Sequence, residues 1–258
     1  MTHPLVAVSD LRHAYDDGNV ALRGISFAVG DGERLALVGA NGAGKSTTLL
    51  HLAGCLLPQA GSVRIGDLPL CRENLPQVRR NVGLLFQNPD DQLFMPRVFD
   101  DVAFGPVNLG LPTDEVAARV MAALAVVGAT HLAQRPPHRL SGGEKRAVAI
   151  ASVLSMSPTV LLMDEPTASL DPVSRRQLIE LLQGFGQTLI IATHDLDMVL
   201  DLCPRTLVLG EGTIIADGAS AVILQDAALL AAARLEKPLR LQACPVCSRR
   251  SPSNGRSP

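Results

Sequence analysis

Three short segments of the chain contain residue types that can bind and cleave a phosphate chain. The first, residues 39–46, reads GANGAGKS. Its glycines let successive backbone N–H groups point at phosphate oxygens, and the N-terminus of a following helix adds positive potential. In such a loop Lys45 supplies a positive charge to the β- and γ-phosphates, and the Ser46 hydroxyl ligates Mg²⁺. The predicted phosphate-binding residues are Gly39, Ala40, Asn41, Gly42, Ala43, Gly44, Lys45, Ser46 and Thr47.

Two adjacent acids end the second segment, VLLMDE at residues 160–165. A carboxylate at the C-terminal end of a strand, here Asp164, can hold Mg²⁺ directly or through water. Glu165 points in a different direction and can orient or deprotonate an attacking water. Two acids after a strand are common in α/β proteins, so the interpretation depends on the glycine loop in the same chain. Together they predict hydrolysis of a bound nucleotide.

The third segment, SGGE at residues 141–144, supports two interpretations. It fits an S-x-x-E capping box, in which Ser141 and Glu144 satisfy each other's backbone N–H groups at the start of a helix. That local role does not explain the paired glycines, Gly142 and Gly143. Glycines leave the helix N-terminus open, so that an anion can approach it.

Strands and helices must bring these segments together. Residues 34–38 form a compact apolar run that enters the glycine loop, and residues 45–53 have helical character after it. Since a phosphate-binding loop requires this strand–loop–helix order, an accidental glycine-rich turn is disfavoured. After residue 141, helical and strand patterns alternate, which predicts a largely parallel sheet with helices on both faces. The further predicted strands are residues 82–86, 159–163, 188–193, 205–209 and 213–216, and the helices are residues 144–155, 172–185 and 196–202.

Other regions depart from this alternation. Residues 5–11 and 25–29 are apolar runs on either side of a turn-rich DDGN, and they predict paired strands. Residues 89–150 predict a mainly helical lobe inserted into the nucleotide-binding core. The expected class is therefore α/β, with a mostly parallel sheet, an N-terminal antiparallel β part and an inserted helical lobe. We expect one domain over residues 1–235 and a disordered tail over residues 236–258, where the sequence lacks apolar periodicity.

One helix of the lobe can be placed in more detail. Thr113 is its expected N-cap, followed by two acids in the first turn, where they favour the helix dipole. Val116, Val120, Leu124 and Val127 then recur at spacings of four, four and three, which gives the helix one apolar face.

Composition narrows the function classes. The 258 residues are 47% hydrophobic and carry a formal net charge of −2, which gives no reason to expect a nucleic-acid partner. Aromatic residues make up only 3%, so stacking platforms for single strands are not expected. No apolar stretch reaches the roughly 20 residues of a membrane span, and the N-terminus does not resemble a signal peptide. We expect a soluble intracellular chain with one nucleotide site and no internal repeat.

The cysteines number five, an odd count, which favours reduced thiols in the cytoplasm. Cys55, Cys71 and Cys203 stand in apolar surroundings and are expected to be packing residues. Cys244 and Cys247 have C-x-x-C spacing, but a zinc site normally needs four ligands and no histidine follows them. We therefore interpret the pair as part of the tail.

Five motifs in a fixed order suggest a family. GANGAGKS, LSGGE and VLLMDE, followed by SLD at residues 169–171 and ATHD at residues 192–195, resemble the ATP-binding cassette ATPases over roughly residues 5–218. The resemblance implies ATP as substrate with Mg²⁺, and a head-to-tail dimer that holds two ATP molecules. Each glycine loop would face the partner chain's Ser141, Gly142 and Gly143. The dimer could form from two copies of this chain or with a homologous second ATPase.

The same resemblance implies roles for single residues. Tyr15 corresponds to the aromatic residue that stacks on adenine, although a tyrosine at a strand end is the plainer interpretation. Gln87 corresponds to the glutamine that senses Mg²⁺ and the γ-phosphate and relays to a membrane partner. Glu165 matches the general base, and His194 matches the histidine that contacts the γ-phosphate, although a lone histidine after a strand is more often structural. Asp171 would lie at the dimer interface.

The segment after Gln87 reads QNPDDQLFMPRVFDDVAFGPVNLGL and resembles the ATPases of energy-coupling-factor importers, especially the cobalt and nickel branch. This implies a peripheral subunit at the cytoplasmic face of the membrane. It would drive an integral membrane transport component and a substrate-binding membrane component. Residues 90–94 would lie near the groove that receives coupling helices. A plainer interpretation is that Phe94, Phe99 and Phe104 are simply the core of the lobe, and both interpretations can hold if lobe and groove form one packing unit.

Other functions stay open on the sequence alone. Vitamin importers use similar ATPases, so the transported solute is the weakest inference. A cassette ATPase without transport, acting as a regulatory or assembly scaffold, is a rival. A small-molecule kinase built on the same glycine loop would leave LSGGE and ATHD unexplained.

Overall fold

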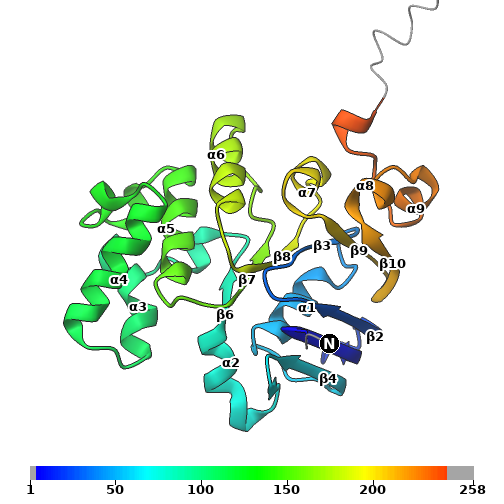
Figure 1. Ribbon diagram of the computed structural model, residues 1–258, viewed down its shortest axis with the longest axis horizontal. Coiled ribbons are helices and arrows are strands. Elements are labelled where there is room, and N and C mark those ends of the chain that lie inside the picture. Colours follow the sequence, from blue (N-terminus) through cyan, green and yellow to red (C-terminus); the bar gives the residue numbers. More distant parts are fainter. Residues whose placement is uncertain (1–3, 243–258) are drawn as a thin grey trace, which may run out of the picture.

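A mostly parallel sheet lies at the centre of the computed structural model, which describes residues 4–242 (Figure 1). In spatial order the six strands found in that range are β10 (Thr213–Ala219), β9 (Arg205–Gly210), β3 (Arg34–Val38), β8 (Thr188–Ala192), β7 (Val160–Asp164) and β6 (Val82–Leu85). Neighbouring strands are parallel except β9 and β10, which are antiparallel. Strands β3, β7 and β8 are buried along nearly their whole length, as expected for parallel strands covered on both faces. The predicted central sheet is confirmed.

A second, antiparallel sheet covers the first helix of the core. Its strands, in spatial order, are β2 (Val20–Val29), β1 (Val6–Ala14), β4 (Ala60–Ile65) and β5 (Leu68–Pro69). Inward side chains from this sheet, from α1 (Lys45–Leu52) and from the central strands form one hydrophobic cluster. The predicted pairing of β1 with β2 is confirmed, although both strands are longer than predicted. Strands β4 and β5 were not predicted, because only Val63 and Ile65 in β4 are buried and Gly61 interrupts the apolar pattern.

Three helices form a group beside the central sheet: α3 (Val98–Asn108), α4 (Thr113–Val126) and α5 (Gly142–Leu154) (Figure 1). They contact one another pairwise, and α5 also contacts β6. Their inward side chains belong to the larger hydrophobic cluster, which continues onto the adjoining face of the central sheet. We refer to α3, α4 and α5 as the helical lobe.

The predicted helix in the lobe begins differently from the expectation. Pro112 occupies the N-cap position, and Thr113 is the first helical residue and makes no capping hydrogen bond. The prediction of Thr113 as N-cap is wrong, because Pro112 already has the extended backbone conformation of a residue that precedes a helix. The apolar face is confirmed at Val116, Val120 and Leu124, which are buried.

The remaining α-helices either connect strands or follow the last strand, β10. They are α2 (Leu75–Asn81), α6 (Pro172–Gln183), α7 (Leu196–Leu202), α8 (Ser220–Ile223) and α9 (Ala227–Ala232). Among residues 4–242, no helix is long and apolar enough to cross a membrane.

The end of the described chain differs from the expected disorder after residue 236. Leu239–Leu241 form a turn of 3₁₀ helix, and Arg240 makes ion pairs with Asp197 and Asp201 of α7. The sequence pattern missed this segment because ion pairs and the packing of single apolar residues such as Leu241 hold it, and neither produces a periodic pattern. Cys244 and Cys247 lie outside the described residues.

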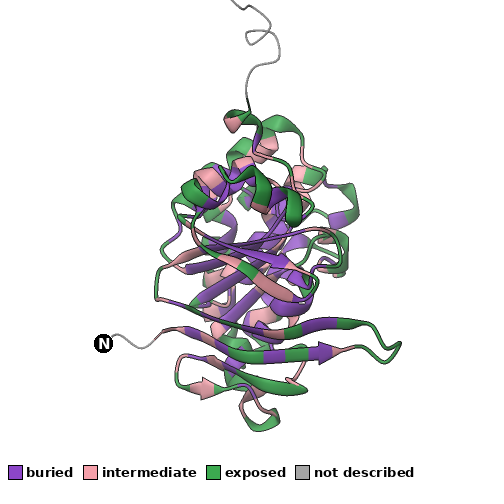
Figure 2. Ribbon diagram, turned by 90° about the vertical axis from the view of Figure 1, so that its right-hand side faces the viewer, coloured by how far each residue is buried: buried purple, intermediate pink, exposed green. Residues whose placement is uncertain are grey.

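Buried residues are concentrated on the strands of the central sheet and on the helix faces that cover it (Figure 2). The cysteines follow this distribution only in part. Cys203 is buried, and burial raises its pKa to about 12. Cys55 is exposed and Cys71 is half-buried, so the expectation that they are packing residues is wrong for Cys55. Both residues lie in connecting turns, where the apolar neighbours in sequence point elsewhere.

Candidate functional site

The glycine loop joins β3 to α1 and is shaped by close backbone contacts. Gly39 and Gly44 have φ values of 156° and 103°. A Cβ added at Gly39 would lie 2.3 Å from the Leu209 carbonyl oxygen, and one added at Gly44 would lie 2.7 Å from the Ala21 carbonyl oxygen. No side chain fits at either position, because both neighbours are backbone atoms. The loop is therefore locked in its conformation by the strands on either side.

Lys45 is held within this loop. Its side chain is buried, and Nζ donates hydrogen bonds to the carbonyl oxygens of Gly39 at 2.7 Å and Ala40 at 3.1 Å. Burial lowers the pKa of Lys45, and the nearby carboxylates of Glu165 and Asp164 act in the opposite direction. A buried ammonium group paired only with carbonyl oxygens gains from a nearby anion.

Side chains from five separate segments line one cavity of about 290 Å³ at the carboxyl ends of the parallel strands. This is the expected place for a ligand in an α/β sheet. Tyr15 follows β1, the glycine loop follows β3, and Gln87 follows β6. Asp164 ends β7, and His194 lies just beyond β8. The lining residues are Tyr15, Asn19, Ala21, Asn41, Gly42, Gly44, Lys45, Ser46, Thr47, Gln87, Asp164, Glu165 and His194.

The structure thus brings most of the predicted site residues together, and it sets some of them apart. Gly39, Ala40 and Ala43 do not line this cavity. Ala40 and Ala43 lie on the other side of the loop, beside a cavity near α9. Ser141 and Gly143 lie elsewhere, as described below.

The oxygen donors predicted for Mg²⁺ share this cavity. Burial raises the pKa of Asp164, and the nearby Ser46 hydroxyl acts in the opposite direction. Gln87 completes the set from the neighbouring strand β6. Hydroxyl, carboxylate and amide oxygens suit a hard divalent cation. A cation beside Asp164 would also offset the cost of ionising a buried acid.

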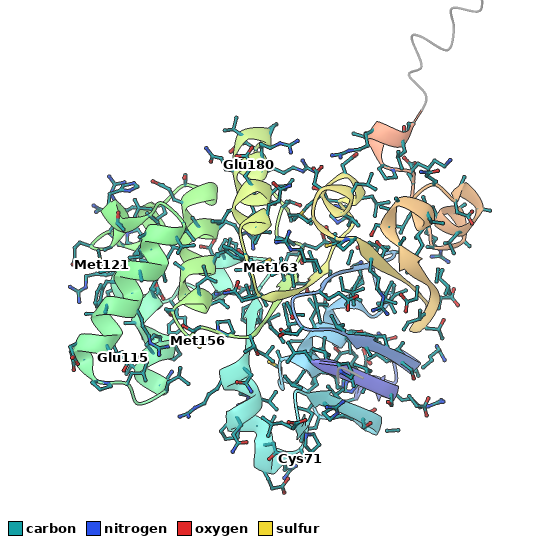
Figure 3. The ribbon with its side chains drawn as sticks, in the orientation of Figure 1. Cys71, Glu115, Met121, Met156, Met163 and Glu180 are labelled. Carbon is teal, nitrogen blue, oxygen red and sulfur yellow. The ribbon has the colours of Figure 1, made fainter. Side chains whose placement is uncertain are left out.

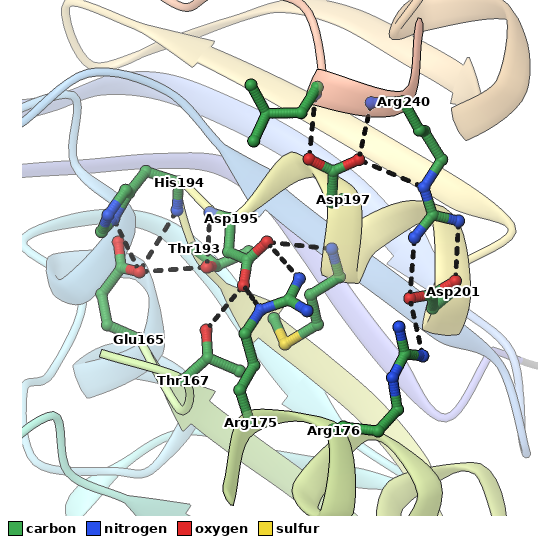
Figure 4. A network of polar contacts seen from close by, with 12 residues as sticks. Glu165, Thr167, Arg175, Arg176, Thr193, His194, Asp195, Asp197, Asp201 and Arg240 are labelled. Atoms are coloured by element: carbon green, nitrogen blue, oxygen red, sulfur yellow. Dashed lines mark hydrogen bonds and ion pairs between the residues drawn. The ribbon is translucent and has the colours of Figure 1, made fainter. Parts of the chain in front are cut away.

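Glu165 is fixed by the residues that follow β8 (Figure 4). Its Oε2 accepts hydrogen bonds from Thr193 Oγ1 at 3.0 Å and from the His194 backbone N–H at 3.2 Å. Nδ1 of His194 also lies 2.9 Å from Oε2. The Glu165 side chain is 9% exposed and that of His194 is 67% exposed. Glu165 has a φ of 45°, an uncommon conformation for a residue other than glycine.

Four residues that the sequence did not single out support this corner of the site. Thr193 joins Glu165 to the backbone N–H of Asp195 through its hydroxyl. Asp195 in turn accepts hydrogen bonds from Thr167 and Arg175. The only sequence signal was the polar run ATHD itself, in which Asp195 also precedes the predicted helix at residues 196–202.

Tyr15 lies at the rim of the cavity with a side chain that is partly exposed. Its hydroxyl is 3.0 Å from Thr47 Oγ1. Its ring makes an edge-to-face contact with His13, and His13 makes a similar contact with His51, both with centroids 4.8 Å apart. Tyr15 therefore lies at the entrance of the cavity, directly after the end of β1, with its hydroxyl and ring both in contact with neighbours.

Ser141 and its two glycines form an open helix N-terminus. Ser141 is the N-cap of α5, its Oγ accepts from the Glu144 backbone N–H, and Glu144 bonds back to the Ser141 N–H, which confirms the capping box. A Cβ at Gly142 would meet nothing within 4 Å. Ser141 and Gly143 line a different cavity of about 500 Å³ beside α6, and no glycine-loop residue lines it in the described part of the chain. The capping-box interpretation of SGGE is confirmed, and the approach of an anion to this N-terminus stays a prediction.

An apolar groove lies between β6, α2 and the helical lobe. Its volume is about 470 Å³, and its lining includes Phe86, Phe94, Phe104 and Met156. Met156 lies where the lobe approaches the sheet (Figure 3). Phe94 is 60% exposed and Phe104 is 43% exposed, and their ring centroids are 5.1 Å apart. Only Phe99 packs against the lobe core, so the lobe-core interpretation is wrong for the other two phenylalanines.

Arg146 of α5 ties the helical lobe to the segment that carries Gln87. The side chain is buried, and it donates to the Phe86 carbonyl at 2.8 Å and the Gln87 carbonyl at 2.5 Å. Gln92 adds a bond from its Nε2 to the Ala149 carbonyl of α5. The groove, the Gln87 segment and α5 are therefore one packing unit.

Comparison with known proteins gives a consistent result. The family model described as "ABC transporter" matches residues 22–168. A Geobacter sulfurreducens protein, whose name places it with ABC transporters but gives no substrate, is 62% identical over 96% of this chain and 100% of its own length. The cobalt import ATP-binding protein CbiO of Rhodobacter capsulatus is 46% identical, over 98% of this chain and 92% of the relative. The energy-coupling factor transporter ATP-binding protein EcfA of Methanothermobacter thermautotrophicus is also 46% identical, over 91% and 77%.

A solved structure supports the same assignment. The structure of cbiO1 from Clostridium perfringens, described as part of the ABC transporter complex cbiONQ, aligns with a TM-score of 0.78 and 41% sequence identity. The alignment covers 86% of this chain and 91% of that chain.

Proposed function

The chain belongs to the ABC transporter family as an ATP-binding subunit and ATPase, and on that premise we propose that it drives an energy-coupling-factor importer for cobalt or nickel ions. The observation that carries this proposal is the 46% identity to a cobalt import ATP-binding protein over 98% of the chain. The exposed aromatic groove adds a surface on which a membrane component can dock.

ATP would bind in the cavity at the carboxyl ends of the strands. The loop N–H groups and Lys45 would hold the β- and γ-phosphates, and the Tyr15 ring would stack on adenine. Ser46, Gln87 and Asp164 would hold Mg²⁺, which would supply positive charge to offset the negative charge of the phosphate chain. The raised pKa of Asp164 supports this, because a buried acid without a cation is costly to ionise.

Hydrolysis would depend on Glu165. Its Oε2 is occupied by Thr193 and His194, whereas no hydrogen bond from the described residues reaches Oε1. Oε1 would accept a proton from the water that attacks the γ-phosphorus, and ADP would leave with the β–γ bridging oxygen. The exposed His194 ring would contact the γ-phosphate and orient it.

A second chain would complete each site. Within one chain the glycine loop and the open N-terminus of α5 line different cavities. A head-to-tail dimer would place the partner chain's α5 N-terminus, with its Ser141–Gly143 motif, against the γ-phosphate, where an open helix N-terminus stabilises an anion. The partner is either a second copy or a homologous ATPase. Asp171, the N-cap of α6, would lie at this interface.

The groove would connect this dimer to the membrane. An integral membrane transport component would insert a helix between Phe86, Phe94 and Phe104, and a substrate-binding membrane component would complete the importer. The subunit would then work at the cytoplasmic face of the membrane as a peripheral protein. Nucleic acid is not an expected partner.

Purification from native membranes tests the proposal. A tagged full-length chain should co-purify with integral membrane proteins, and vesicles that contain the complex should take up Co²⁺ or Ni²⁺ only with ATP. Phe94→Asp should release the membrane proteins, while Val222→Asp, at an exposed apolar residue of α8, should not.

Two outcomes would favour other functions. Recovery only as a free dimer with normal ATPase activity would contradict the importer and favour the regulatory or assembly scaffold. ATP-dependent uptake of a vitamin without uptake of either ion would contradict the substrate and retain the importer.

A further inference from the structure

Hydrogen bonds connect the carboxylate of Glu165, through Thr193 and Asp195, to the N-terminus of α7 (Figure 4). Thr193 Oγ1 donates to Glu165 Oε2 at 3.0 Å and accepts from the Asp195 backbone N–H at 3.0 Å. Asp195 is the N-cap of α7, and its Oδ1 accepts from the Met198 N–H. The start of α7 and the position of the Glu165 carboxylate are therefore set by the same contacts.

Asp195 also ties α7 to α6. Arg175 of α6 donates to both Asp195 carboxylate oxygens, from Nε at 2.6 Å and from Nη2 at 2.8 Å, and Thr167 adds a bond at 3.0 Å. Burial alone would raise the pKa of Asp195, but these hydrogen bonds outweigh it and the pKa is lowered. The Asp195 carboxylate is therefore ionised and held from both helices.

The outer side of α7 is held by the segment at residues 238–241. Arg240 makes a two-point contact with Asp201, from Nη1 at 2.8 Å and Nη2 at 2.9 Å, and its Nε donates to Asp197 at 3.1 Å. The Leu239 backbone N–H donates to Asp197 at 2.9 Å. One guanidinium thus bridges two acids of the same helix.

This bridge matters because α7 is electrostatically unfavourable without it. Asp197 and Asp201 are four residues apart, a spacing at which like charges on a helix repel. Asp201 also lies in the last turn, where the helix dipole disfavours an anion. Arg176 contributes only one contact of 3.6 Å to Asp201. A helix of seven residues has little stability of its own. Core packing holds the inner side of α7, where four of its residues are buried, and these ionic contacts hold its outer side.

We propose that Arg240 is a positioning residue for ATP hydrolysis, which acts by holding α7 so that Thr193 and His194 keep the Glu165 carboxylate in place. The inference rests on the roles proposed above for Glu165 and His194. The C-terminal segment would therefore contribute to the hydrolytic step rather than to nucleotide binding, because the contacts of Arg240 lead to Glu165 and not to the glycine loop.

The test compares variants of the purified full-length chain for kcat and for nucleotide Kd, with the Tm as a check on folding. Arg240→Ala should lower kcat about threefold to tenfold, with Kd and Tm nearly unchanged, because one charge-assisted network contact is lost. Arg240→Lys should have an intermediate effect, since lysine cannot make the two-point contact. The matched control is Arg97→Ala, which breaks a two-point contact with Asp100 on the helical lobe and should leave kcat unchanged.

A second measurement separates positioning from a general loss of structure. If repulsion between the two acids displaces α7, Asp197→Asn in the Arg240→Ala background should restore part of the lost kcat. High salt should lower kcat of the wild type toward that of Arg240→Ala and affect the variant less.

The outcomes distinguish this inference from the proposed function. A wild-type kcat in Arg240→Ala, with turnover abolished in Glu165→Gln, would overturn the role of Arg240 alone. Full turnover in Glu165→Gln would instead overturn the assigned base. If Arg240→Ala does not fold, kcat of Arg240→Lys and the salt dependence of the wild-type kcat test the role of Arg240 instead. A wild-type kcat in Arg240→Lys, together with a wild-type kcat that does not depend on salt, would contradict the proposal.

Discussion

The two sides of the nucleotide cavity are built in different ways. The glycine loop is a single segment, held by backbone atoms that leave no room for a side chain at Gly39 or Gly44. The hydrolytic corner is assembled from three segments, and its key carboxylate, Glu165, is held by side-chain hydrogen bonds through Thr193 and Asp195. The loop is therefore shaped by steric contacts before any proposed phosphate binds. The corner depends on contacts that a shift of α7 can make or break, which suits a step that has to be switched.

The largest effect should come from the corner itself. Glu165→Gln should reduce hydrolysis by about 10²–10⁴-fold, because the proposed general base would be lost while the loop and Lys45 would still bind ATP. Phosphate release measured at saturating ATP, together with nucleotide binding, checks this. The closed dimer should also persist longer with ATP, which gel filtration would detect. Full turnover in the variant would show that the two sides do not divide binding and chemistry in this way.

A substitution in the glycine loop should impair ATP binding, whereas the substitution at Glu165 should impair hydrolysis. Gly39→Ala should weaken ATP binding by about tenfold or more, because its Cβ would clash with the Leu209 carbonyl and the loop would have to shift. Titration with a fluorescent ATP analogue measures the effect. Gly18→Ala is the matched control, since it also has positive φ but nothing within 4 Å, and it should bind ATP normally. Equal affinities in the two variants would contradict a loop fixed by steric contacts.

A substitution at the open N-terminus of α5 tests whether one chain alone forms a complete ATP site. Ser141→Arg should reduce hydrolysis by about tenfold, because it removes the cap and blocks the approach of an anion from a partner chain. Nucleotide binding by the monomer should be unchanged, and Thr113→Arg on the exposed side of α4 should alter neither property. Normal activity of Ser141→Arg at concentrations where the dimer forms would argue against a shared site.

The smallest effect concerns stability and pH. The pKa of Asp164 is raised by burial, so the folded state binds this proton more tightly than the unfolded state does. Stability in the absence of Mg²⁺ and ATP should therefore fall as pH rises above the ordinary aspartate pKa. Asp164→Asn should flatten this part of the pH profile and raise Tm at neutral pH by about 1–4 °C. Thermal unfolding of both proteins between pH 4 and 7 measures this difference. If the Tm of the wild type changed with pH in the same way as that of Asp164→Asn, burial of Asp164 would not be the cause.

The sequence predicted the glycine loop more completely than the corner around Glu165. The loop could be predicted because its proposed phosphate-binding residues form one continuous run. Close backbone contacts also require glycine at Gly39 and Gly44. At the corner, Glu165 and His194 were identified, but Thr193, Thr167 and Arg175 were not, since their roles appear only when strands and helices meet. Arg240 was placed in an expected tail, because single ionic contacts leave no periodic signal. The fold class was predictable from strand and helix alternation, whereas β4, with only two buried side chains, was not.

The contact between Arg146 and the Phe86 and Gln87 carbonyls has a mechanical consequence. Arg146 lies five residues after Ser141 on a single uninterrupted helix, and a helix transmits a displacement along its length with little distortion. A displacement of the groove at Phe94 would therefore move the Gln87 carbonyl and the N-terminus of α5 together. Helix α5 would therefore couple the groove, which would bind the membrane partner, to its own N-terminus, which would face a second nucleotide.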